Sequence, residues 1–182
     1  MRKTTQKASW SHLRHHLTVL DHTVLIGLIH DLYTASKDNQ IFLHTRFALS
    51  DDVLAPYKAT ISRWVNPDMI RNQDISVSNA RKAISDYKKA IGRPEGLADL
   101  SVFYCEACAD LLDCCGMDEE GYFNALVRMF KQALMAIQKL NPSERADFLE
   151  RLKHVQNEGH NWGWGVGDDM DDLMAEYGFV EE

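Results

Sequence analysis

The sequence predicts an all-α protein, because amphipathic periodicity, helix caps and short turns recur along the chain while no convincing strand pattern does. The clearest helix covers residues 118–140, where apolar residues recur at steps of three and four and so share one face. Asp118 is placed to cap its first turn, because its carboxylate can accept backbone N–H groups that the turn leaves unpaired. Over the whole chain we expect eight or nine helices.

The same start and stop signals continue on both sides of that helix. Residues 141–144 (Asn-Pro-Ser-Glu) supply a cap, a proline for the first turn and the glutamate of a capping box, so the next helix is expected to begin there. A last short helix is expected to begin at Asp168 and to end at Gly178. Upstream, four further helices are expected to begin at caps that precede apolar stripes: Asp21, Asp38 (a helix to about Leu49), Asp51 (a helix to about Val65), and Ser76 or Ser78.

The helix expected over residues 94–116 differs from the others because it is apolar nearly all round. Its polar side chains form one narrow acidic strip, made of Asp99, Glu106, Asp110 and Asp113. A helix with so little polar surface is typical of the centre of a fold, so we expect neighbouring helices to pack on two or three of its sides.

Short turns between consecutive helices favour antiparallel hairpins, in either a closed bundle or a short stack of the HEAT or TPR kind. Residues 84–91 and 127–134 share a pattern at an offset of 43 positions, which lies among the periods of HEAT-type pairs. The chain has 182 residues, 45% of them hydrophobic, and no linker rich in proline, glycine or serine. We therefore predict a single helical domain over residues 1–182.

Charge is uneven along the chain. The last fifteen residues, 168–182, hold seven carboxylates and no lysine or arginine, which equals the whole net charge of −7. Residues 1–8 form a basic arm, but a few dispersed positive charges are typical of a solvated terminus, so nucleic acid is not a favoured partner. No apolar run reaches the about 18 residues that a membrane span requires, and no signal-peptide core follows the N-terminus. These features favour a cytoplasmic location without membrane association.

Four cysteines lie close together at Cys105, Cys108, Cys114 and Cys115. A structural zinc site is one interpretation, because two of them have the C-x-x-C spacing. The spacing falls inside a helix, however, and no second C-x-x-C pair is present. Free cysteines that pack as small apolar side chains are the favoured alternative.

Histidines suggest a second kind of site. His12 and His16 are four residues apart, so one helix could direct both towards one metal ion. His30 and Asp31 are adjacent on a helix, and this pair resembles the signature of the HD-domain phosphohydrolases. The resemblance implies a divalent metal that activates water, with His12, His16 or His160 as further ligands. The residues after the pair depart from that family, because they continue the helix where the family has a turn of small residues.

Residues 160–169, HNWGWGVGDD, form the least ordinary segment of the chain. Four of the ten glycines lie at or beside it, interleaved with two tryptophans. One interpretation is that the indole rings anchor a loop to the helical body. The other is a binding surface for a partner or small ligand, since function tends to lie on irregular segments of a rigid scaffold. The candidate binding residues are His160, Trp162, Trp164, Asp168 and Asp169.

Several segments together resemble a family of uncharacterised bacterial helical proteins. They are LIxLIxDLY early in the chain, LAPYKATI, ARKAISDYKKAIG followed by GLADL, and GVGDD near the end. The resemblance implies an all-helical fold and no assigned activity.

No constellation for nucleophilic or di-iron chemistry stands out, so we predict no cofactor and assign no catalytic residue. The sequence instead favours an intracellular helical protein-interaction or adaptor module with a protein partner. The alternative is a metal-dependent phosphohydrolase centred on His30 and Asp31, which would need a divalent metal.

Overall fold

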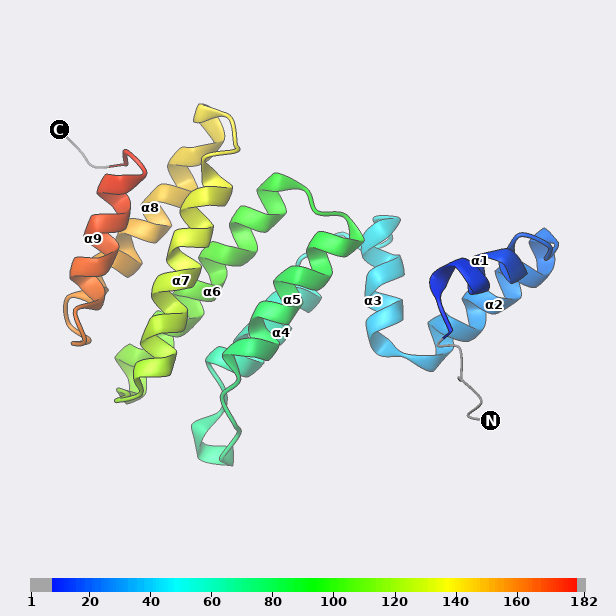
Figure 1. The fold of residues 1–182 in the computed structure, drawn as a ribbon. Coiled ribbons are helices and arrows are strands. Elements are labelled where there is room, and N and C mark those ends of the chain that lie inside the picture. The colour runs from blue at the N-terminus through cyan, green and yellow to red at the C-terminus, as the bar shows by residue number, and fades with distance from the viewer. Residues whose placement is uncertain (1–7, 180–182) are drawn as a thin grey trace, which may run out of the picture. The chain divides into compact units, whose positions relative to one another are not determined.

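A computed structural model describes residues 8–179, and over that range it contains nine α-helices, one short 3-10 helix and no strand (Figure 1). The predicted all-α class is therefore confirmed. Within the same range, no helix is both long and apolar enough to cross a membrane. The chain divides into two compact units, residues 1–43 and residues 44–182, and each is described by itself.

The first unit consists of a helical hairpin and the beginning of a third helix. Its helices are α1 (Trp10–Leu17), α2 (His22–Ala35) and the first part of α3 (Lys37–Arg46). Asp21 caps α2 as predicted, because its carboxylate accepts a hydrogen bond of 2.9 Å from the backbone N–H of Val24. None of the residues from 8 to 43 is buried, so this unit has no core of its own. Most of the predicted basic arm lies outside the described residues.

The second unit contains the longer helices and the core. After the end of α3 come α4, the 3-10 helix η1, and α5 to α9: Ala55–Val65, Met69–Arg71, Val77–Ala90, Pro94–Cys115, Glu120–Ile137, Pro142–Gly159 and Val166–Glu176. Ser76 caps α5 by accepting from the backbone N–H of Asn79, as predicted. The predicted capping box is also present, since Glu144 accepts from the backbone N–H of Asn141 at 3.1 Å.

Helix α6 lies at the centre of this unit, as its apolar sequence predicts. It packs against α4, α5, α7 and α8, and twelve of its residues are buried. Helix α7 adds a second apolar stripe, which includes the fully buried Leu126, Phe130 and Leu134. One buried polar contact joins distant helices, because the hydroxyl of Tyr122 donates a hydrogen bond of 2.6 Å to the carbonyl of Val65. The core is therefore built around α6 and α7.

The helices of the second unit pack as hairpins beside one another (Figure 1). Consecutive helices form the pairs α4–α5, α6–α7 and α8–α9, and further contacts join α4 to α6, α6 to α8 and α7 to α9. Each helix thus contacts mainly its neighbours and next neighbours in the sequence. This is the contact pattern of stacked helical hairpins.

The structure corrects two predicted helix starts in the first third of the chain. Helix α3 begins at Lys37, so Asp38 lies in its first turn instead of capping it, and the helix ends at Arg46, three residues before the predicted end. Before α4 the capping side chain is Asp52 and not Asp51: Asp52 Oδ1 accepts from two backbone N–H groups, at 2.8 and 3.1 Å. A sequence pattern does not distinguish two adjacent aspartates as caps. The geometry of the turn determines which carboxylate can accept the backbone N–H groups.

Two later caps are also corrected, and both changes involve the segment between α8 and α9. Helix α7 has Glu119 at its N-cap position, and Asp118 instead accepts a hydrogen bond from a tryptophan. Helix α9 begins at Val166 after a left-handed Gly165, so Asp168 lies in its first turn. Both aspartates are thus free of the capping role that the sequence suggests.

Two of the four carboxylates in the acidic strip of α6, those of Asp99 and Glu106, pair with cations from two other helices. Arg151 of α8 donates to both oxygens of Glu106, each at 2.7 Å, and to Asp99 at 2.9 Å. Lys58 of α4 contacts the second oxygen of Asp99 at 2.6 Å. All four side chains are partly buried, so the network ties α4, α6 and α8 together where water screens charges less than at an open surface.

The cysteines follow the packing interpretation at two of their four positions. Cys105 and Cys108 are buried in α6, and burial raises the pKa of both thiols, that of Cys108 to about 12. Cys114 and Cys115 are exposed at the end of the helix, with their sulfur atoms 3.3 Å apart. Among the described residues the cysteines form no group of three or more metal ligands.

Candidate functional site

The segment between α8 and α9 is held against the last turn of α6 and the loop that follows it by two indole rings. Trp162 Nε1 donates a hydrogen bond of 2.7 Å to Asp113, and Trp164 Nε1 donates one of 3.0 Å to Asp118. The ring of Trp164 also stacks on Phe123, with centroids 6.4 Å apart and an interplanar angle of 27°. The anchoring interpretation of the tryptophans therefore has a direct geometric basis, although Trp164 is still 56% exposed.

Backbone geometry makes the turn between the two helices tight. Gly163, Trp164 and Gly165 have φ values of 78°, 56° and 69°, so three consecutive residues occupy the left-handed region. Glycine adopts this conformation readily, whereas it costs a residue with a side chain about 1 kcal/mol. The indole hydrogen bond and the ring stacking are the contacts that offset this cost at Trp164.

A second pair of glycines lets the end of α8 touch the start of α9. A Cβ atom on Gly167 would lie 2.4 Å from Nδ1 of His160 and 2.8 Å from its backbone nitrogen. A Cβ atom on Gly159 would lie 3.4 Å from the Cα of Gly167. A side chain at position 167 would not fit this approach, whereas one at position 159 would only be tight, and the approach places the imidazole of His160 directly over the first turn of α9.

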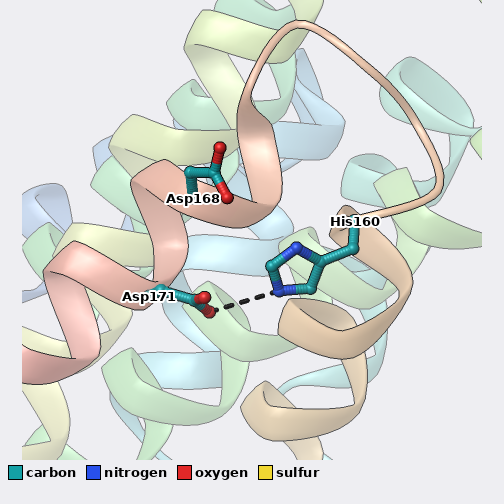
Figure 2. A group of neighbouring side chains, drawn as sticks. All are labelled: His160, Asp168 and Asp171. Atoms are coloured by element: carbon teal, nitrogen blue, oxygen red, sulfur yellow. Dashed lines mark ion pairs between the residues drawn. The ribbon is translucent and has the colours of Figure 1, made fainter.

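This approach gathers His160, Asp168 and Asp171, which Figure 2 shows around one point of the α8–α9 junction. One ligand atom from each residue lies within 4.8 Å of the others. His160 Nε2 lies 3.4 Å from Asp171 Oδ1, and the same oxygen accepts a hydrogen bond of 2.7 Å from Gln156. It is the one group of three or more histidine, cysteine, aspartate or glutamate ligands in residues 8–179, and all three side chains are exposed.

The donor set of this group suits a divalent cation, because imidazole nitrogen and carboxylate oxygens together bind several such metals. The arrangement is also explained without a metal. Asp168 lies in the first turn of α9, where the helix dipole stabilises negative charge. Asp171 follows three residues later on the same face of the helix, where its carboxylate pairs with His160.

Prediction of this group from the sequence was partial. His160 and Asp168 are among the predicted binding residues and are brought together, whereas Asp169 is not part of the group. Asp171 was missed. Its signal is the i, i+3 spacing from Asp168, which puts both carboxylates on one helix face.

The other predicted metal ligands do not form such a group within the described chain. His12 and His16 are exposed on α1, and His30 and Asp31 are exposed on α2 with Nδ1 and Oδ1 3.9 Å apart. No third ligand among the described residues joins the pair. The HD-like phosphohydrolase stays a prediction that this geometry does not support.

Comparison of the chain with protein-family models, with curated proteins and with solved structures gives no match. The function must therefore be argued from the molecule itself.

We expect Trp162→Phe to lower the free energy of unfolding by about 1 kcal/mol, because the ring stays while the hydrogen bond to Asp113 is lost. Thermal unfolding followed by circular dichroism should show a loss of about 2–4 °C in Tm. The matched control is Trp10→Phe, since Trp10 is 65% exposed and should leave Tm unchanged. A Trp162→Phe protein as stable as the original would show that the indole does not anchor the loop.

Proposed function

We propose that the protein is a helical interaction module in which the α1–α2 hairpin joins two copies of the chain. In this proposal the second unit is the scaffold that each copy carries. A cytoplasmic location in a bacterial cell belongs to the same proposal and rests on the sequence segments quoted above. The observation that supports the proposal is the apolar surface of α2.

Helix α2 is apolar and nevertheless exposed. Val24, Leu28 and Leu32 follow one another at steps of four and so form a stripe along one face, with exposed fractions of 48%, 38% and 53%. Ile26 and Ile29 extend the apolar surface around the helix and are 52% and 46% exposed. In a water-soluble protein, a helix that is apolar around most of its circumference is normally buried.

The small size of the first unit makes this exposure more significant. Isolated short helices are marginal in water, and units of about 40 residues usually need oligomerisation, metals or disulfides to be stable. This unit has no buried side chain among residues 8–43 and the chain has no cysteine before Cys105. Each side chain of the stripe is already about half covered, so covering the rest contributes about 1 kcal/mol per side chain, and a partner along the whole stripe would stabilise the hairpin.

A second copy of the chain fits this surface for two reasons. Two identical hairpins can close into a four-helix bundle, with the same stripe contributed by both copies in a two-fold arrangement. Charge does not oppose it: residues 1–43 carry five lysine and arginine residues against three aspartates, so their net charge is only +2 with neutral histidines. Two copies of this unit would repel each other only weakly.

The test is the mass of the full-length protein in solution, by size-exclusion chromatography with light scattering over a range of concentrations. We expect twice the chain mass of 20.8 kDa for the original protein. The double variant Leu28→Glu and Leu32→Glu should be monomeric, because it places four carboxylates in the proposed interface. Both positions are exposed in the single chain, so the thermal transition of the second unit should stay in place.

His30→Gln is the matched control, because His30 is exposed on the side of α2 opposite to the stripe. It should leave the dimer intact. A monomeric original protein, or a double variant that stays dimeric, would refute the proposal.

A further inference from the structure

A groove of about 540 Å³ lies between α5 and α7 in the second unit. Its lining includes three cationic side chains (Arg81, Lys82 and Lys88), two apolar ones (Ile84 and Met129) and the amide of Gln132. None of the groove's lining residues is an aspartate or glutamate.

The charge of this groove is opposite to that of the chain as a whole. Helix α5 carries four basic residues and one acidic residue, a net charge of +3, in a protein whose net charge is −7. Charges of one sign that gather in a concave surface raise the local concentration of ligands of the opposite sign. The groove is therefore suited to an anionic ligand.

Two of the three cations are not neutralised by the described part of the protein. Arg81 and Lys88 are exposed, and no carboxylate of residues 8–179 forms an ion pair with either of them. Lys82 differs, because it contacts Asp86 at 2.6 Å, and that aspartate also accepts from Lys89. The positive charge at Arg81 and Lys88 is thus available to a ligand.

The lining between the cations is apolar. Ile84 is half-buried, and Met129 of α7 is 1% exposed and fully packed into the core beneath the groove. Gln132 and the hydroxyls of Ser78 and Ser85 add hydrogen-bonding groups. Ile84 is therefore the apolar side chain that a ligand can reach between the cations.

We propose that this groove binds an acidic polypeptide segment, with carboxylates on Arg81 and Lys88 and an apolar side chain against Ile84. Its wall on α5 extends from Ser78 to Lys88, about 15 Å at 1.5 Å per residue, which matches a short segment. Nucleic acid fits less well, because its continuous phosphate charge would extend from this small basic area over an acidic protein. The proposal goes beyond the hairpin-mediated association and does not depend on it.

The test is a fluorescence-anisotropy titration of the full-length protein into a short labelled peptide of glutamates with a central leucine. We expect saturable binding that weakens as salt is added, because the ion pairs lie at the surface. Arg81→Glu and Lys88→Glu should each weaken binding about tenfold or more, since each replaces an attraction by a repulsion. Neither residue has an ion pair to lose among the described residues, so Arg81→Glu should retain the original Tm. Lys88→Glu should lower Tm only slightly, because Lys88 lies in the last turn of α5, where the helix dipole favours a positive charge.

Lys139→Glu is the matched control, because it makes the same charge change at an exposed position outside the groove and should not alter the affinity. The peptide with lysine in place of glutamate should not bind. The proposal is overturned if the glutamate peptide does not bind at low salt, if the two groove variants bind it as well as the original protein does, or if a short single-stranded DNA binds more tightly than the peptide. Each of these results is separable from the hairpin proposal, because the mass in solution is measured independently.

Discussion

Replacing Gly96 by alanine is expected to lower the free energy of unfolding by about 3 kcal/mol, because one added methyl group would overlap a buried ring. A Cβ atom at this position in the first turn of α6 would lie 2.0 Å from the hydroxyl of Tyr87 and 2.5 Å from its Cζ. Tyr87 cannot move aside easily, since it is 2% exposed and packs edge-on against Tyr57 at 5.5 Å. The overlap must therefore be relieved by separating α5 from α6.

Chemical denaturation followed by circular dichroism measures this loss. Gly121→Ala, in the first turn of α7, is the matched control. A Cβ atom there would contact only the flexible carboxylate of Glu119, at 3.8 Å. Alanine is also a better helix former than glycine by up to about 1 kcal/mol. The second substitution should therefore be neutral or stabilising. Tyr87→Phe should recover part of the loss in a Gly96→Ala background, because it removes the atom with the closest approach. Equal stability of the two alanine variants would contradict the packing at Gly96.

The second large effect is expected at Arg151. Arg151→Met should lower the free energy of unfolding by about 2 kcal/mol, because Glu106 then has no partner and Asp99 keeps only Lys58. The value is below that of a fully buried pair, since the side chain of Arg151 is 27% exposed and water screens part of the interaction. Arg151→Lys should be intermediate, because an ammonium group cannot reproduce the two parallel hydrogen bonds to Glu106.

A double-mutant cycle separates the ion pair from simple loss of packing. Glu106→Gln in the Arg151→Met background should recover part of the stability, since it removes the carboxylate that was left without a partner. Arg81→Met is the matched control, because it removes an exposed arginine that has no ion pair among the described residues. Additive effects of the two substitutions would show that the network contributes no coupling.

The helices themselves could be predicted from the sequence because their signals are local. The apolar stripe of α7 and the capping box before α8 each lie within a few residues of the helix they specify. The failure at Asp118 has the opposite cause. Its carboxylate is used by Trp164, which is 46 residues away, and no local pattern shows that the turn before α7 and the segment before α9 meet.

In the candidate sites, too, the residue types could be predicted from the sequence, whereas the contacts between distant segments could not. The residue types of His160 and Asp168 mark them as candidates in the sequence, but their proximity to Asp171 depends on the absence of a side chain at Gly167. The basic residues of α5 are visible in the sequence, whereas the groove needs Met129 and Gln132 from another helix. The acidic strip of α6 was similarly visible, but its partner Arg151 was not, because the pairing depends on where α8 packs.

The stacking of hairpins in the second unit has a consequence for how the chain folds. Most helix contacts join neighbours or next neighbours in the sequence, so closing each hairpin orders only a short length of chain. Domains rich in such local contacts fold quickly. During synthesis, α4 and α5 can form their hairpin before α8 has left the ribosome, and the bonds from Arg151 and the two tryptophans would form last, after both partner segments are in place. These late contacts are the ones expected to slow unfolding most, because interactions that are absent from the transition state determine how long the native state persists.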